Sequence, residues 1–596
     1  MEYKARKDMN PAYMWDMTHI FPDTAAWEAA YKEAEELVAV LPALEGTLGA
    51  SVQSLKHGLD TLFAASRKVE LVYVYASLCK SGDNGDASYQ AMEGKATNLY
   101  VSFSTAVSFF DPEVLSIDPA TLDRYMDDPS LAGYRHILED TARGRAHTLD
   151  AKGEKMLAML GDAAQSSSNT FDMFESVDMT FPKIKDENGD EVQLTHGNFS
   201  VFRESKNKDV RHAAFDAYFG EFRKYINTLA ATYSGSVKMD SYYSDVRGYA
   251  SACERALFSN NVPVSVYDSL IEAIHAGLPT MKKYLALRKK VLGLDTLTMY
   301  DLYVPMVEDV DFAVSYEEAK ALVKKATAPL GERYGQLLDE AYENHWMDVY
   351  ENKGKTTGAF SCGVYGVHPY VLLNFTDTLD DAYTMAHELG HAMHSYFSSE
   401  ANDYANHDYR IMVAEVASTV NEVLLSKYLL KTETDKKKRA NILNHLLEGF
   451  RTTVFRQTLF AEFERKAHEM YKAGTPLTAE TLNRVYRELN ELYYDGAYVN
   501  ELQDIEWARI PHFYNAFYVY QYATGFCSAV AIAEQILSSG DASGYLKFLS
   551  TGGSDYPIEE LKIAGVDLTK PETVQNALRV FADTLDGLES LLDEIG

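Results

Sequence analysis

The chain has 596 residues, of which 46% are hydrophobic, and a formal net charge of −32 at pH 7. It is too long for one hydrophobic core, and so acidic a chain lacks the basic footprint that nucleic-acid binding requires. No apolar run approaches the roughly 20 residues that span a bilayer, and the N-terminus lacks the apolar stretch of a secretory signal. Four scattered cysteines are typical of free thiols in a reducing compartment. We expect a cytoplasmic protein without nucleic-acid or membrane partners, and its oligomeric state stays open.

Most of the chain has the periodicity of amphipathic helices. Apolar residues recur at steps of three and four, with Ala, Glu, Lys and Leu between them. Examples are TAAWEAAYKEAEELVAVL from Thr24 and EEAKALVKKATAPLGERYGQLLDEAY from Glu317. The pattern predicts a mainly α protein.

One interruption of the helical pattern is FPKIKDENGDEVQLTH, which begins at Phe181. Its alternating arms flank Asn188-Gly189 and predict a β-hairpin with a tight turn. We place a domain boundary after this hairpin. Residues 1–200 would then form an N-terminal helical domain that ends in the hairpin, and residues 201–596 a second domain.

A second interruption is the glycine-rich stretch from Gly354, which runs into the apolar YVLLNF from Tyr370. YVLLNF predicts a short strand. Because an exposed sheet edge can pair with a peptide backbone, an edge position would suit a peptide-binding protein. An interior position in the sheet is the equally favoured alternative.

Residues 378–398 predict a helix, with Thr378 as the capping residue of a capping box that Asp381 completes. Within it, the stretch HELGH places His387 and His391 four residues apart, on one helical face. Imidazoles at that spacing can bind one zinc ion, and Glu388 beside the first histidine is suited to act as a general base. The alternative is a pair of surface histidines.

A third ligand would come from the next helical segment, which begins near Asp408. Glu415 would complete a His-His-Glu set with one open coordination position, and Glu422 would accept a hydrogen bond from a ligand histidine. For both glutamates the alternative is a solvated helix face. We expect His394 to be a packed or surface histidine and His407 to be a polar loop residue.

Tyrosines recur near the C-terminal end in PHFYNAFYVYQYATGF. Tyr514, Tyr518 and Tyr522 are four residues apart and predict one stripe on a helix, with Tyr520 pointing elsewhere. Such stripes are usually core or interface. Together with His512, however, a tyrosine hydroxyl would suit the stabilisation of an oxyanion.

These segments together resemble the oligoendopeptidase F family, within the thimet-oligopeptidase group of zinc metallopeptidases. The resemblance covers nearly the whole chain, and the motifs that carry it are WDMTHIFP, ALFSNNVPVSVYDSLI, GAFSCGVYGVHPYVLLNFTDTLDDAYTMAHELGHAMHSYFS, VAEVASTVNEVLL and HFYNAFYVYQYATGF. It implies a mostly helical, two-lobed, neurolysin-like molecule with a deep channel and a small β-sheet near the metal. Residues 201–596 would be the catalytic domain.

The resemblance also implies site roles and a reaction. One zinc ion per chain would be bound by His387, His391 and Glu415, with Glu388 as the catalytic glutamate. Internal bonds of short peptides would be hydrolysed, and folded proteins would be excluded.

The transition-state-binding residues of the family fall on His512 and Tyr522, with Tyr518 and Tyr520 as rivals. A carboxypeptidase or dipeptidyl carboxypeptidase with the same site is the alternative enzyme. A catalytically silent peptide-binding protein is the alternative outside the enzymes.

Overall fold

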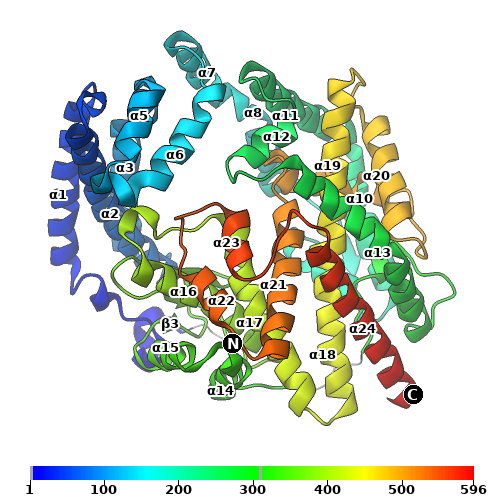
Figure 1. The fold of residues 1–596 in the computed structure, drawn as a ribbon. Coiled ribbons are helices and arrows are strands. Elements are labelled where there is room, and N and C mark those ends of the chain that lie inside the picture. The colour runs from blue at the N-terminus through cyan, green and yellow to red at the C-terminus, as the bar shows by residue number, and fades with distance from the viewer. Residues whose placement is uncertain (1–3, 308–311, 596) are drawn as a thin grey trace. The chain divides into compact units, whose positions relative to one another are not determined.

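The computed structural model describes residues 4–307 and 312–595. The chain is mainly helical, as predicted, and forms two compact units, each of which combines distant segments (Figure 1). The first unit comprises Met1–Ala146, Phe312–Tyr428 and Ile532–Val566, and the second comprises His147–Asp311, Leu429–Ala531 and Asp567–Gly596. The boundary near residue 200 is a different division and stays a prediction, as does the channel.

The first unit holds the N-terminal helices, a small sheet and the helices that follow it. Its elements are α1 (Thr24–Val40), α2 (Val52–Gly82), α3 (Ala87–Ala106), α4 (Phe110–Ser116), α5 (Pro119–Met126), α6 (Arg135–Arg143), α14 (Tyr316–Ala326), α15 (Glu332–Glu343), β3 (Met347–Asp348), β4 (Phe360–Cys362), β5 (Tyr370–Leu372), α16 (Leu379–Ala401), most of α17 (Ile411–Thr432), α22 (Ser543–Leu549) and α23 (Pro557–Ile563).

The second unit holds a hairpin and the remaining helices. Its elements are α7 (Ala151–Ala164), α8 (Ser166–Met173), β1 (Lys183–Lys185), β2 (Glu191–Gln193), α9 (His196–Glu204), α10 (Lys208–Lys224), α11 (Ile226–Val246), α12 (Ala252–Phe258), α13 (Val264–Val291), α18 (Lys436–Gly449), α19 (Arg456–Lys472), α20 (Ala479–Tyr493), the first part of α21 (Tyr520–Ser539) and α24 (Glu572–Ile595).

Local signals in the sequence agree with these elements in most places. The helix predicted from Thr24 is α1, and the hairpin is β1 paired antiparallel with β2, with Gly189 at φ 86° in its turn. The segment from Glu317 is two helices rather than one. Pro329 and Gly331, which has φ 97°, separate α14 from α15, because neither residue suits a helix interior.

The strand YVLLNF lies inside a sheet of the first unit. The strand order is β3-β5-β4, with β5 parallel to β3 and antiparallel to β4, so β5 is the middle strand and its residues are buried. The interior alternative is therefore confirmed. The edge strands of this sheet are β3 and β4, and α16 packs against both β4 and β5.

Helices α16 and α17 cross in direct backbone contact. A Cβ atom added at Gly390 would lie 2.6 Å from the Ala417 carbonyl oxygen and from the Ser418 Cα atom. The Asn421 side chain donates a hydrogen bond to the Ala386 carbonyl oxygen at 3.0 Å. As residue numbers fall along α16 they rise along α17, so the two helices are antiparallel.

No helix in the described ranges is long and apolar enough to cross a membrane. All four cysteines are free thiols, as predicted. Three of them are buried, and burial raises the pKa of Cys79, Cys253 and Cys527 to about 12.

The contact at Gly390 generates a prediction. In Gly390→Ala the added methyl group would push α16 and α17 apart, so we expect the free energy of unfolding to fall by about 1–3 kcal/mol. Gly335 in α15 is the matched control, because a Cβ there meets nothing within 4 Å. Gly335→Ala should be neutral or stabilising by up to about 1 kcal/mol. Thermal unfolding monitored by circular dichroism compares the two, and equal effects would contradict a close crossing.

Candidate metal centre

The N-terminal end of α16 is fixed by side chains that its own sequence supplies. Thr378 accepts a hydrogen bond from the Asp381 backbone N–H, and the Asp381 carboxylate accepts hydrogen bonds from the Thr378 and Thr376 backbone N–H groups. This capping box, predicted from the sequence, starts the helix at Leu379. The starting point sets which face of α16 carries the histidines.

His387, His391 and Glu415 converge in the first unit. The two Nε2 atoms are 3.2 Å apart, and Glu415 Oε2 lies 3.5 Å from the first and 3.6 Å from the second. Among the described residues these three form the one group of His, Cys, Asp and Glu side chains close enough to hold a metal ion. The helix crossing at Gly390 brings Glu415 to the histidine pair.

The outer nitrogens of both imidazoles are occupied. His387 Nδ1 donates a hydrogen bond to Glu422 Oε1 at 2.5 Å, and His391 bonds the Ala414 backbone. Each Nε2 then presents a lone pair to the other and to the Glu415 carboxylate. Three lone pairs that face one another are repulsive unless a cation lies between them.

The spacing of the donor atoms fits a tetrahedral ion. Bonds of 2.0–2.1 Å in tetrahedral geometry separate neighbouring ligand atoms by about 3.3 Å, close to the observed 3.2–3.6 Å. Two imidazoles and one carboxylate form a set with a fourth position left for water or substrate. The residues therefore fit a divalent transition metal such as zinc.

The pKa values in this cluster reflect burial and the carboxylates. Burial lowers the pKa of His387, but the hydrogen bond and charge of Glu422 outweigh it and raise this pKa to about 9. Burial and the charge of His387 lower the pKa of His391 to about 4. The two rings therefore prefer one shared positive charge, which a bound cation would replace.

Glu388 lies beside the donor set without belonging to it. Its side chain is 7% exposed, and burial raises its pKa to about 7, against the opposing charge of His387. A carboxylate with a pKa near neutrality can both accept and return a proton at physiological pH.

Two further histidines lie outside the donor set. His394 is 1% exposed and stacks on Tyr409 with ring centroids 3.6 Å apart, and burial lowers its pKa to about 3. His407 donates a hydrogen bond from Nδ1 to the Tyr404 carbonyl oxygen in the loop between α16 and α17. The predicted packed and loop roles are confirmed.

Gly390 and Asn421 were missed by the sequence analysis. Both hold α16 against α17, and Tyr334 in turn donates a hydrogen bond to the Asn421 side chain at 2.9 Å. The available signals were a glycine inside HELGH and a polar residue in an otherwise apolar stretch of α17. Neither residue by itself indicates which helix it packs against.

The predicted tyrosine stripe on one helix is wrong. Pro511–Tyr514 is a 3-10 turn, and α21 begins only at Tyr520. Between them Phe517 has φ 59°, a left-handed conformation that an α-helix cannot contain. Tyr518 therefore lies before the helix rather than on it.

The chain around this bend nevertheless groups three of the predicted side chains within the second unit. His512 Nε2 lies 3.3 Å from the Tyr522 hydroxyl oxygen, and the Tyr518 and Tyr522 rings are 5.5 Å apart between centroids. Burial lowers the pKa of His512, which favours a neutral imidazole. Tyr520 is 1% exposed and packs against Tyr267. The half-buried group is therefore His512, Tyr518 and Tyr522.

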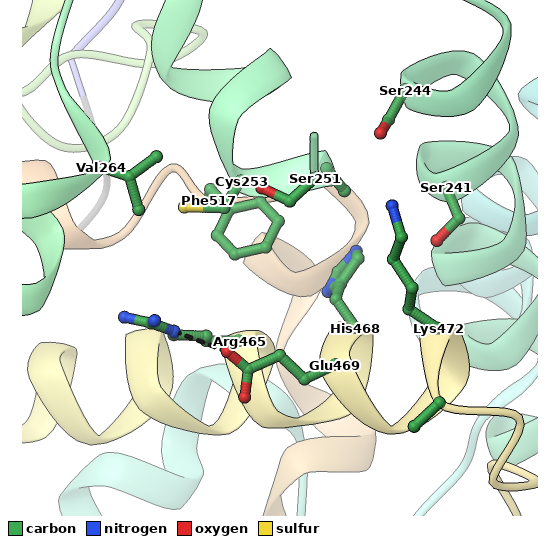
Figure 2. Close-up of a pocket in the computed structure, with 12 residues that line it drawn as sticks. Ser241, Ser244, Ser251, Cys253, Val264, Arg465, His468, Glu469, Lys472 and Phe517 are labelled. Atoms are coloured by element: carbon green, nitrogen blue, oxygen red, sulfur yellow. Dashed lines mark hydrogen bonds and ion pairs between the residues drawn. The ribbon is translucent and has the colours of Figure 1, made fainter. Parts of the chain in front are cut away.

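Phe517 also lines a cavity of about 470 Å³ in the second unit (Figure 2). Figure 2 shows Cys253 and Val264 on its apolar side. Its charged groups have protein partners: Arg465 donates to Glu469 at 2.9 Å, and His468 Nε2 lies 3.2 Å from Asp240. The cavity offers no unpaired acid and base together, so it does not compete with the metal centre as a candidate active site.

The hydrogen bond from His387 to Glu422 generates a prediction. In Glu422→Gln the imidazole loses its anionic partner, so we expect metal affinity to fall about 10- to 100-fold. The control is Glu36→Gln, an exposed charge on α1, which should leave affinity unchanged. Competition with a chromophoric chelator measures both, and equal affinities would contradict the orienting role of Glu422.

The chain matches known protein families and full-length relatives. The model of peptidase family M3 matches residues 201–580, and that of oligopeptidase F matches residues 113–181. Oligopeptidase PepF of Bacillus subtilis is 45% identical, with 99% of this chain and 89% of that protein covered. An oligoendopeptidase F homolog of Lactococcus lactis is 41% identical, with 99% of each chain covered.

Solved structures give the same result. The crystal structure of oligoendopeptidase-F from Enterococcus faecium is 36% identical, with a TM-score of 0.75, and the match covers 95% of this chain and 99% of that chain. The two family models, the full-length relatives and this solved structure all point to one family. The chain therefore belongs to peptidase family M3, and within it to the oligoendopeptidase F group of peptide-hydrolysing metallopeptidases.

Proposed function

We propose that the protein is a zinc-dependent oligoendopeptidase that hydrolyses internal bonds of short peptides, with one zinc ion per chain. The observation that carries the proposal is the triangle of His387, His391 and Glu415 donor atoms, with the Glu388 carboxylate buried beside it. Family membership supplies the reaction class, and this geometry supplies the residues that would perform it.

Bound zinc would supply a Lewis acid that activates water and polarises a carbonyl group. Glu388 would accept the proton of the attacking water on its carboxylate and deliver it to the leaving amine. Its burial favours both transfers, because the charged and neutral forms are close in free energy near pH 7. Glu422 would keep His387 in the tautomer that presents Nε2.

His512 and Tyr522 are the proposed donors to the oxyanion of the transition state. Their side chains already lie within hydrogen-bond distance of each other in the second unit. A neutral imidazole N–H and a phenol O–H are both suited to a developing negative charge. Tyr518 is the alternative donor. Tyr520 is a less suitable donor because its side chain is buried.

Substrate binding would use the unpaired edge of β4 rather than β5. An extended peptide added to this edge would be bound through its backbone, which tolerates varied side chains. Backbone binding needs no free C-terminal carboxylate, and this distinguishes an endopeptidase from a carboxypeptidase.

Digestion of a mixed library of C-terminally amidated peptides, read by mass spectrometry, tests the proposal. We expect internal cleavage of short peptides, loss of cleavage with a chelator, and recovery when zinc is restored. Cleavage that requires a free C-terminal carboxylate would support the carboxypeptidase alternative. Metal binding without any cleavage would support a silent peptide-binding protein.

Variants assayed on the same peptide library test which residues act as general base and metal ligand. Glu388→Gln should retain the metal but lose turnover by about 10²- to 10⁴-fold, because the general base is removed. His387→Ala should lose the metal itself, as elemental analysis would show, and Glu36→Gln should behave as wild type. A near-native rate for Glu388→Gln would refute the base assignment.

Phenylalanine variants of Tyr518 and Tyr522 test which of the two hydroxyl groups stabilises the oxyanion. Tyr522→Phe should lower kcat by about 10²- to 10³-fold and change KM less, because the hydroxyl acts mainly in the transition state. Tyr518→Phe is the matched control and should change kcat little. Steady-state kinetics on one amidated peptide compare them, and the reverse ranking would move the role to Tyr518.

A further inference from the structure

A cavity of about 350 Å³ in the first unit adjoins the metal centre, and we call it the α16–β4 pocket. Its walls come from α2, β4, α16, α17 and the loop between the last two helices. The volume lies at the lower end of the roughly 300–1,000 Å³ typical of ligand pockets. It is large enough for one long side chain of a peptide.

The pocket continues the face of α16 that carries the metal ligands. Ser395 and Ser399 line it, and they follow His387 and His391 at the same step of four residues. Residues at that step share one face, so the pocket begins one helical turn, about 5.4 Å along the axis, beyond His391. On α17 the pocket is lined by Ala414, which immediately precedes the ligand Glu415.

The strand β4 and its next residues form another wall. Ser361 and Gly363 line the pocket at a spacing of two, which puts both on one face of the extended chain. A Cβ atom at Gly363 would lie 2.8 Å from Ser395 Cβ, so the chain passes closely over α16 there. A peptide paired with the β4 edge would direct alternate side chains to this same face.

The charged groups of the pocket are mainly acidic. Glu70 and Asp408 line it, and neither has an ion-pair partner within the described ranges. The guanidinium of Arg67 stacks over the Tyr365 ring at 4.9 Å and interacts with Glu70 electrostatically without an ion pair. His407, also in the wall, interacts with Glu70 electrostatically without an ion pair.

Two polar groups in this wall have few hydrogen-bond partners. Glu70 accepts one hydrogen bond, from the Tyr404 hydroxyl, and burial raises its pKa. Ser361 Oγ is buried without a hydrogen-bond partner. The Glu70 carboxylate therefore keeps acceptor capacity in the wall of the pocket, which suits a ligand that donates hydrogen bonds.

We propose that the α16–β4 pocket is a substrate subsite that binds a cationic group of the peptide, either a Lys or Arg side chain or a free α-ammonium group. An ammonium or guanidinium group would donate to Glu70 and Asp408. This proposal rests on the proposed peptidase function, because it assigns a side-chain preference to the same site. The preference belongs to one substrate position, since the pocket lies one helical turn from the metal ligands.

The experiment uses one amidated peptide series in which Lys replaces norleucine at each position in turn. Norleucine matches the lysine stem without its charge. We expect wild-type enzyme to prefer Lys about tenfold in kcat/KM at one position, and Glu70→Gln and Asp408→Asn each to reduce that ratio toward one. The series is run with free and with acetylated N-termini. A wild-type ratio near one, together with a fall in kcat/KM on acetylation in wild type but not in the two variants, would identify the α-ammonium group as the ligand.

The controls separate this subsite from general electrostatics and from the peptidase function itself. Glu36→Gln removes one exposed negative charge elsewhere and should keep the wild-type ratio. Circular dichroism shows whether each variant is folded, and exposed Asp408 is the variant that should fold if Glu70→Gln does not. A Lys/norleucine ratio and an effect of acetylation that both equal wild type in folded Asp408→Asn and Glu70→Gln would overturn the subsite. Failure of wild type to cut any peptide of the series, with Lys or with norleucine, would instead overturn the peptidase function.

Discussion

The close backbone contact of α16 with α17 at Gly390 is the constraint on which the metal centre is built. Glycine has no Cβ, so the Ala417 carbonyl and the Ser418 Cα can approach the helix to 2.6 Å from where that atom would be. Asn421 then bonds the α16 backbone, and Tyr383 and Ser426 share a hydrogen bond one further step along the pair. This spacing places a carboxylate from one helix within 3.6 Å of imidazoles on the other.

A second consequence of this crossing is that one helical face carries two kinds of chemistry. The first part of that face presents metal donors, and its continuation at Ser395 and Ser399 lines the α16–β4 pocket. Both are fixed by the same helix, which its capping box starts at Leu379. The distance between the proposed metal site and the proposed subsite is therefore set by helix geometry rather than by a loop.

Local patterns predicted the parts of the site that lie within one element. The box of Thr378 and Asp381, the histidine spacing of α16 and the turn at Gly189 each involve residues a few positions apart, and the structure contains all of these features. The tyrosine stripe failed for a related reason. The tyrosines have helical spacing, but Phe517 adopts φ 59° and packs against His468. This tertiary contact overrides the local periodicity.

From the amino-acid order alone follow the helical class, the helix that carries His387 and His391, and the free state of the cysteines. These properties depend on periodicity, capping and composition, which act over short distances. The interior position of β5, the helix partner of Gly390 and the convergence of Glu70 with Ser361 required the folded chain. Each of them joins segments far apart in sequence, and short-range patterns do not specify which distant surfaces pack together.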